Sequence, residues 1–192
     1  ELESVGFIRR LFEHTLMVGV AEEFVKIVPV LLALSCGAAT QGFFSRVRVR
    51  EPLDAILIAS SSAIGFVALE TIFLYCNPSN VTSDYEAWAA LQLLIPRIFI
   101  SIGGHVAYSG YFGYFIGLGL IHKRHFWPLF FIGFVTAAVS HGLWNAIAVM
   151  GTPYMIAASC SSYLLLVAAI FRARALSPSA LRHTVYGPEN AG

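Results

Sequence analysis

The stretch AEEFVKIVPVLLAL, residues 21–34, places Glu22, Glu23 and Lys26 inside an otherwise apolar segment. Near the centre of a membrane helix each such charge costs about 2.5 to 3.5 kcal/mol on insertion scales, so the three residues need a partner or a function. The whole chain of 192 residues is 57% hydrophobic and only 12% charged, and its apolar residues come in long blocks. This composition is typical of a polytopic membrane protein and not of a soluble domain.

Five apolar blocks are long enough to cross about 30 Å of hydrocarbon, which takes roughly 20 helical residues. They cover residues 15–41, 53–76, 91–121, 127–150 and 153–172. The blocks predict an all-α, polytopic transmembrane helix bundle of about five spans, with residues 1–192 as a single membrane-embedded domain. The third block is over-long and contains Pro96, so we expect a kink, a steep tilt or a protruding end there. Residues 1–14 mix charged and apolar residues, which is typical of an interfacial helix or of the end of a preceding span.

Lysine and arginine indicate the orientation, because they are enriched in cytoplasmic loops. They occur between the first two blocks, between the third and fourth, and after the fifth, as Arg46, Arg48, Arg50, Lys123, Arg124, Arg172, Arg174 and Arg182. The alternate loops, 77–90 and 151–153, contain neither residue type. We therefore expect the basic segments in the cytoplasm and the alternate loops outside; Arg9 and Arg10 disagree with this orientation.

Ionisable residues in four of the blocks lie at similar depth. At 1.5 Å per residue they are roughly 9 to 20 Å from the outer ends of their helices. The residues are Glu22, Glu23, Glu70, His105 and His141, and Asn145 shares a helix face with His141. Because isolated charges are costly in a bilayer, this arrangement predicts one shared polar cavity in the outer half of the membrane.

The residue types in this cavity are suited to amide hydrolysis. Lys26, one turn after the paired glutamates, can keep one of them ionised as a general base for water. His141 and Asn145 can donate hydrogen bonds to a developing oxyanion, while His105 arrives from another helix to orient the water or the glutamates.

Four motifs then carry a family resemblance: EEFVK (22–26), FVALE (66–70), HVAYSGYFG (105–113) and HGLWN (141–145). In this order they resemble the EExxK, FxxxE, histidine-plus-glycine and HxxxN motifs of the PrsW intramembrane proteases. That family is related to the type II CAAX prenyl proteases, which have EExxxR and a second-motif histidine where this chain has Glu70. The resemblance implies that the catalytic residues are Glu22, Glu23, His105, His141 and Asn145, with Lys26, Phe66 and Glu70 in support.

The resemblance also implies a substrate and a location. PrsW-like proteins are implied to cleave membrane-anchored anti-sigma factors at an extracytoplasmic site, so the expected partners are a membrane-anchored protein substrate and the lipid bilayer. The expected location is a bacterial cell membrane, with the active site toward the extracytoplasmic side. A net charge of +1 gives no indication of nucleic acid binding.

The protease class follows by exclusion, whereas the metal requirement stays open. The sequence contains no HExxH, no GxSG and no pair of intramembrane aspartates, which leaves the glutamic type. Two histidines with up to three carboxylates are also suitable ligands for zinc. By analogy with the CAAX relatives we expect catalysis without a metal or other cofactor, with zinc as the alternative.

Two other classes of function remain compatible with the same residues. A proton-coupled transporter also uses Glu, His and Lys near the midplane, although the sequence has no inverted repeat. A catalytically inactive scaffold that binds other membrane segments is the other class. Independently of these classes, Glu22 and Lys26 are also compatible with a structural ion pair that closes the helix bundle.

Overall fold

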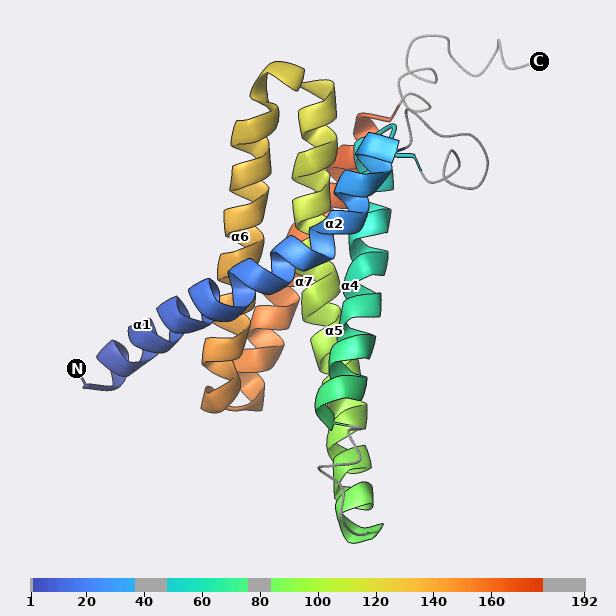
Figure 1. Ribbon diagram of the computed structural model, residues 1–192. Helices are drawn as coiled ribbons and strands as arrows, with labels where there is room; N and C mark the ends of the chain where they lie inside the picture. The colour runs from blue at the N-terminus through green and yellow to red at the C-terminus, as the bar shows by residue number, and fades with distance from the viewer. Residues whose placement is uncertain (1, 37–47, 76–83, 178–192) are drawn as a thin grey trace.

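The computed structural model describes residues 2–36, 48–75 and 84–177, and within these ranges the secondary structure is helical with no strand (Figure 1). The elements are α1 (Leu2–His14), a π-helical segment (Thr15–Gly19), α2 (Val20–Cys36), α4 (Pro52–Tyr75), α5 (Asp84–Ile121), α6 (Phe126–Ile147) and α7 (Thr152–Ala175). The expected all-α membrane bundle is confirmed.

The helices follow the apolar blocks, with differences at their ends. The first block is divided between the π-helical segment and α2, and its residues 37–41 lie outside the described ranges. Helix α5 runs without a break through Pro96, and its start protrudes with the end of α4 beyond the α6–α7 connection (Figure 1). In the described ranges, the stretches that are long and apolar enough to cross a membrane are Pro52–Thr71, Lys123–Met150 and Pro153–Ala175.

Local chemistry explains where α4 and α7 begin. Pro52 occupies the first turn of α4, where its missing N–H costs nothing. The Asp54 carboxylate accepts hydrogen bonds from the backbone N–H groups of Arg50 at 2.9 Å and Glu51 at 3.3 Å, which satisfies donors that precede the helix. Gly151, with φ of 108°, makes the turn into α7, in a backbone conformation that side chains disfavour.

Helix α5 is the central element of the bundle. It packs most extensively against α4 and also contacts α6, α7 and α2. The continuous rod formed by α1, the π-helical segment and α2 crosses α6 and α5 obliquely (Figure 1). The main core lies between α2, α4, α5 and α6 and includes Ile27, Val30, Ala55, Ala59, Phe112, Ile116 and Ala137.

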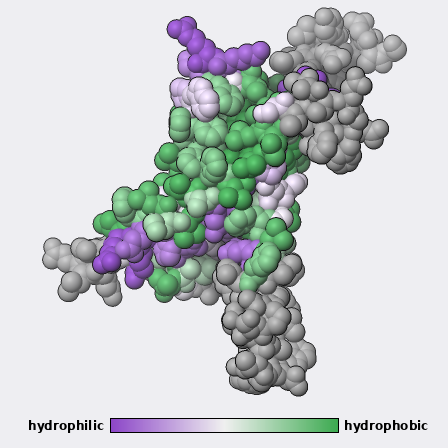
Figure 2. All heavy atoms as spheres, in the orientation of Figure 1, coloured by the Kyte–Doolittle hydropathy of each residue, from purple (hydrophilic) through white to green (hydrophobic). Residues whose placement is uncertain are grey.

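The surface agrees with a membrane location. An apolar band covers the middle of the face in Figure 2, with hydrophilic side chains above it and along α1. The start of α4, the α5–α6 turn with Lys123 and Arg124, and the end of α7 with Arg172 and Arg174 lie at one end of the bundle (Figure 1). Arg46 and Arg182 lie outside the described residues. The basic segments that are described thus share one end, as the orientation rule requires.

Candidate active site

A buried cluster of ionisable side chains lies where α2, α5 and α6 meet. Glu23 and Lys26 come from α2, His105 from α5 and His141 from α6, and each of these residues is at most 4% exposed. Glu22, the neighbour of Glu23, has a side chain that is 20% exposed. The structure thus brings together glutamates and histidines that are more than 80 residues apart in the sequence.

Lys26 connects the cluster through all of its N–H groups. Its ammonium donates to Glu23 Oε1 at 2.7 Å, to His105 Nδ1 at 2.7 Å and to Glu22 Oε2 at 3.2 Å. An ammonium has three hydrogens, so each of its N–H donors has an acceptor. The Phe66 ring of α4 lies 4.6 Å from Nζ and adds a cation–π contact.

The two glutamates have different environments. Glu23 accepts at Oε1 from Lys26 and from His141 Nδ1, the latter at 3.0 Å, and at Oε2 from Ser109 at 2.7 Å. Glu22 uses Oε2 for Lys26, and this oxygen lies 3.7 Å from His141 Nε2. Among the described residues, nothing is bonded to Oε1 of Glu22. Glu22 is therefore the carboxylate with acceptor capacity left for an incoming group.

The hydrogen-bond partners define the tautomers of the two histidines. Nδ1 of His141 faces the Glu23 carboxylate, which only accepts, so Nδ1 carries the hydrogen and Nε2 of the neutral ring has a lone pair. Nδ1 of His105 faces the Lys26 ammonium, which only donates, so the hydrogen of the neutral ring is on Nε2. The ring centroids are 4.8 Å apart. In the neutral rings, Nε2 of His141 is therefore a hydrogen-bond acceptor and Nε2 of His105 is a donor.

Three of these residues fit a divalent metal. Glu22, His105 and His141 each offer a ligand atom, and the three atoms lie within 4.8 Å of one another. Three protein ligands with an open position are typical of catalytic zinc, and the contact between Glu23 and His141 orients a ligand histidine in the usual way. If His105 binds the metal through Nε2, the hydrogen of its neutral ring must be on Nδ1. Lys26 must then be an uncharged amine that accepts a hydrogen bond from Nδ1. The charge of Lys26 and metal binding are thus coupled.

The other predicted site residues lie around this cluster. Asn145 is half-buried on α6, four residues after His141, and has no hydrogen-bond partner in the described part of the chain. Phe66 contacts Lys26 as described above, and Glu70 follows one turn later on α4, half-buried. Asn145 is thus one helical turn from His141, and Glu70 is one turn from Phe66. The cluster itself is defined by Glu22, Glu23, Lys26, His105 and His141.

Two residues of the cluster were missed in the sequence. Ser109 donates to Glu23, and the Tyr108 ring stacks on His141 with centroids 5.3 Å apart. Both follow His105 by three and four residues, so they lie on its helix face within the third motif. That spacing was the available signal. The signal is weak, because an uncharged side chain costs little free energy in a membrane helix and therefore does not by itself indicate a functional site.

A close backbone contact positions α2 against α6. A Cβ on Gly142 would collide with the side chain and backbone of Thr15, and one on Gly19 would collide with the backbone carbonyl of Ala138. Both contacts belong to the π-helical segment, three residues before the glutamate pair. The segment that leads into α2, which carries Glu22, therefore packs directly against α6, which carries His141.

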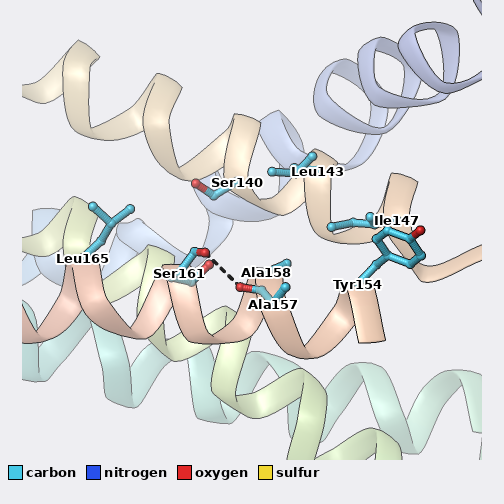
Figure 3. A pocket seen from close by; sticks show the side chains of 9 residues that line it. Ser140, Leu143, Ile147, Tyr154, Ala157, Ala158, Ser161 and Leu165 are labelled. Carbon is cyan, nitrogen blue, oxygen red and sulfur yellow. Dashed lines mark hydrogen bonds between the residues drawn. The ribbon is translucent and has the colours of Figure 1, made fainter. Parts of the chain in front are cut away.

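A groove lies between α6 and α7 (Figure 3). It has a volume of about 330 Å³ and is lined by small and apolar side chains, including Ser140, Leu143, Ala157 and Ser161. The Ser161 hydroxyl donates to the Ala157 carbonyl at 2.8 Å, so it is engaged with its own helix. None of the ionisable residues of the cluster lines this groove, and the groove offers no activated nucleophile.

Comparison with known proteins identifies the family of the chain. The model of a family described as "PrsW family intramembrane metalloprotease" matches residues 1–173. Neither a curated protein nor a solved structure matches the chain. The family description and the Glu22, His105 and His141 group both weigh against the expected absence of a metal, and that expectation is not supported.

Proposed function

The chain belongs to the PrsW family of intramembrane proteases, and on that premise we propose that it hydrolyses a peptide bond of a membrane-anchored protein. The observation that carries the proposal is the buried cluster in which two glutamates, a lysine and two histidines from three helices share hydrogen bonds. Ionisable groups are retained in membranes mainly where they perform chemistry. By resemblance we propose an anti-sigma factor as the substrate, cleaved on the extracytoplasmic side of a bacterial cell membrane.

Glu22 is the general base in this proposal. Its side chain is partly exposed, and one of its oxygens is not used by the described residues, so it can accept a proton from water. Glu23 has both oxygens occupied and orients His141. Lys26 donates a hydrogen bond to each of the two carboxylates. The protonated Glu22 then supplies the hydrogen that the leaving amine needs.

Glu22, His105 and His141 would hold the metal that the family description implies. When bound, such an ion polarises the scissile carbonyl and makes a bound water more acidic. A carboxylate has two oxygens, so Glu22 keeps one acceptor for the proton with or without the metal. Glu23 and Lys26 orient the two histidines behind it.

The donors to the oxyanion follow from the tautomers. The pair of His141 and Asn145, expected from the sequence, requires an imidazolium at His141, because the hydrogen of the neutral ring is directed to Glu23. Asn145 donates in either case through its amide. In a metal-free site His105 adds a second donor through Nε2.

The test is cleavage of single-span membrane substrates by the purified protein in liposomes. Glu22→Gln should abolish cleavage without loss of fold, and Glu23→Gln should also impair it because His141 loses its charged partner. The matched control is Glu13→Gln, an exposed carboxylate paired with Arg9 on the same helical rod, which should cleave like the wild type. Full activity in both cluster variants, or no cleavage of any substrate by the wild type, would refute the proposal.

The metal is tested separately by elemental analysis and chelation. We expect one zinc per chain, loss of that zinc in His141→Ala, and inactivation by chelators that added zinc reverses. Full activity of a protein freed of metal would reject the metal and leave Glu22 as the base.

A further inference from the structure

Tyr108 has a buried hydroxyl without a hydrogen-bond partner in the ranges that the structure describes. The residue is only 3% exposed. A buried hydroxyl that is left unpaired is unfavourable, and native proteins rarely keep one without a reason. A phenylalanine would fill the same space without this cost.

The ring of Tyr108 lies inside the charged cluster. It stacks on His141 with an interplanar angle of 24° and lies 5.3 Å from the His105 ring. Nζ of Lys26 is 5.7 Å from its centroid. Tyr108 therefore contacts each of the cationic or imidazole groups of the site.

The direction of the ring follows from Gly104. Side chains on a helix lean toward its N-terminus, and a Cβ on Gly104 would stand 3.4 Å from Cε1 of Tyr108. The same position is 3.7 Å from Cδ2 of Trp144, the neighbour of Asn145. The outer part of the ring thus points back along α5, toward the place where Gly104 faces the Trp144 side chain of α6.

We propose that Tyr108 is a further catalytic residue whose hydroxyl donates a hydrogen bond to an oxygen of the reacting groups. That oxygen belongs either to the scissile carbonyl or to the attacking water, and both are acceptors of the same chemistry. The phenol stays neutral throughout, so no proton is transferred. This role rests on the proposed peptidase function.

The decisive variant is Tyr108→Phe, which removes one oxygen and keeps the ring. Its kcat should fall by roughly 10²-fold with KM little changed, as for loss of one oxyanion donor. Its midpoint of thermal unfolding should not be lower than that of the wild type, because no partner is lost. Tyr111→Phe, one turn further on α5 and outside the cluster, is the matched control and should keep the wild-type kcat.

A peptide whose scissile carbonyl is reduced to a methylene distinguishes the two oxygens. Equal affinity for wild type and Tyr108→Phe assigns the hydrogen bond to the carbonyl, and weaker binding to the variant assigns it to the water. Wild-type kcat in Tyr108→Phe, with Glu22→Gln inactive, would overturn the role of Tyr108 and leave the peptidase intact. A lower unfolding midpoint or an equal loss in Tyr111→Phe would also overturn it, whereas an inactive wild type would refute the peptidase itself.

Discussion

Replacing Lys26 by methionine tests the electrostatics on which the site depends. Methionine has a similar volume and no charge, so the substitution removes three hydrogen bonds with little change in packing. The side chains of Lys26 and Glu23 are both 0% exposed, so water cannot replace the lost ammonium. Among the residues that the structure describes, Glu23 would keep His141 and Ser109 as donors.

The size of the effect follows from the cost of an unpaired buried charge. Removal of one partner of a buried ion pair typically costs about 3 to 5 kcal/mol, and we expect Lys26→Met to lose that much free energy of unfolding. The double variant Lys26→Met/Glu23→Gln no longer buries the unpaired carboxylate. It should therefore be more stable than the sum of the single variants predicts, by about 1 to 3 kcal/mol.

The assay is reversible unfolding of the detergent-solubilised protein, followed by helical circular dichroism. The matched control is Lys123→Met, an exposed lysine in the α5–α6 turn, which should change stability by less than about 0.5 kcal/mol. If Lys26→Met loses no more free energy of unfolding than Lys123→Met, and the effects of the double variant are additive, the Lys26 ammonium does not stabilise the cluster. That result would refute the role of Lys26 as its central ion-pair partner.

Three other perturbations test separate parts of the structure. Asn145→Ala should lower kcat by roughly 10²- to 10³-fold at nearly constant KM in the cleavage assay, and unchanged turnover would remove Asn145 from the site. Gly142→Ala should cost about 1 to 3 kcal/mol in thermal unfolding, because the new methyl group collides with the π-helical segment. Gly65→Ala, with no atom within 4 Å, should be neutral or slightly stabilising, and equal losses would contradict the close contact. In a variant without native cysteines, Met150→Cys should react with an impermeant thiol reagent on intact cells and Lys123→Cys only after lysis; the reverse pattern would invert the orientation.

The charged part of the site was predictable because charge is costly in a membrane. Glu22, Glu23, His105 and His141 lie at similar depths in their blocks. Each of these polar groups needs a partner in the membrane, and a helix bundle supplies partners most simply when the four side chains converge. The structure brings these four together, with Lys26 at the centre. Their chemical roles remain proposals, since depth indicates proximity and not function.

Finer features were not predictable from hydropathy. Neither the Ser109 bond to Glu23 nor the stacking of Tyr108 on His141 leaves a signal in the apolar pattern. The π-helical segment also leaves no signal in the hydropathy pattern, because a change of hydrogen-bond register within a helix leaves the apolar block continuous. Asn145 shows the opposite limit: its place beside His141 was expected, but in the described structure it has no partner that would define its role.

The contact between the π-helical segment and α6 has a consequence for sequence variation. Positions 19 and 142 touch neighbouring backbone so closely that only glycine fits, although neither residue carries a reactive group. Mutations there would move the glutamates relative to His141, so we expect selection for catalysis to constrain both positions. Active relatives with this architecture should therefore vary least at two sites that a purely chemical view of the enzyme would overlook.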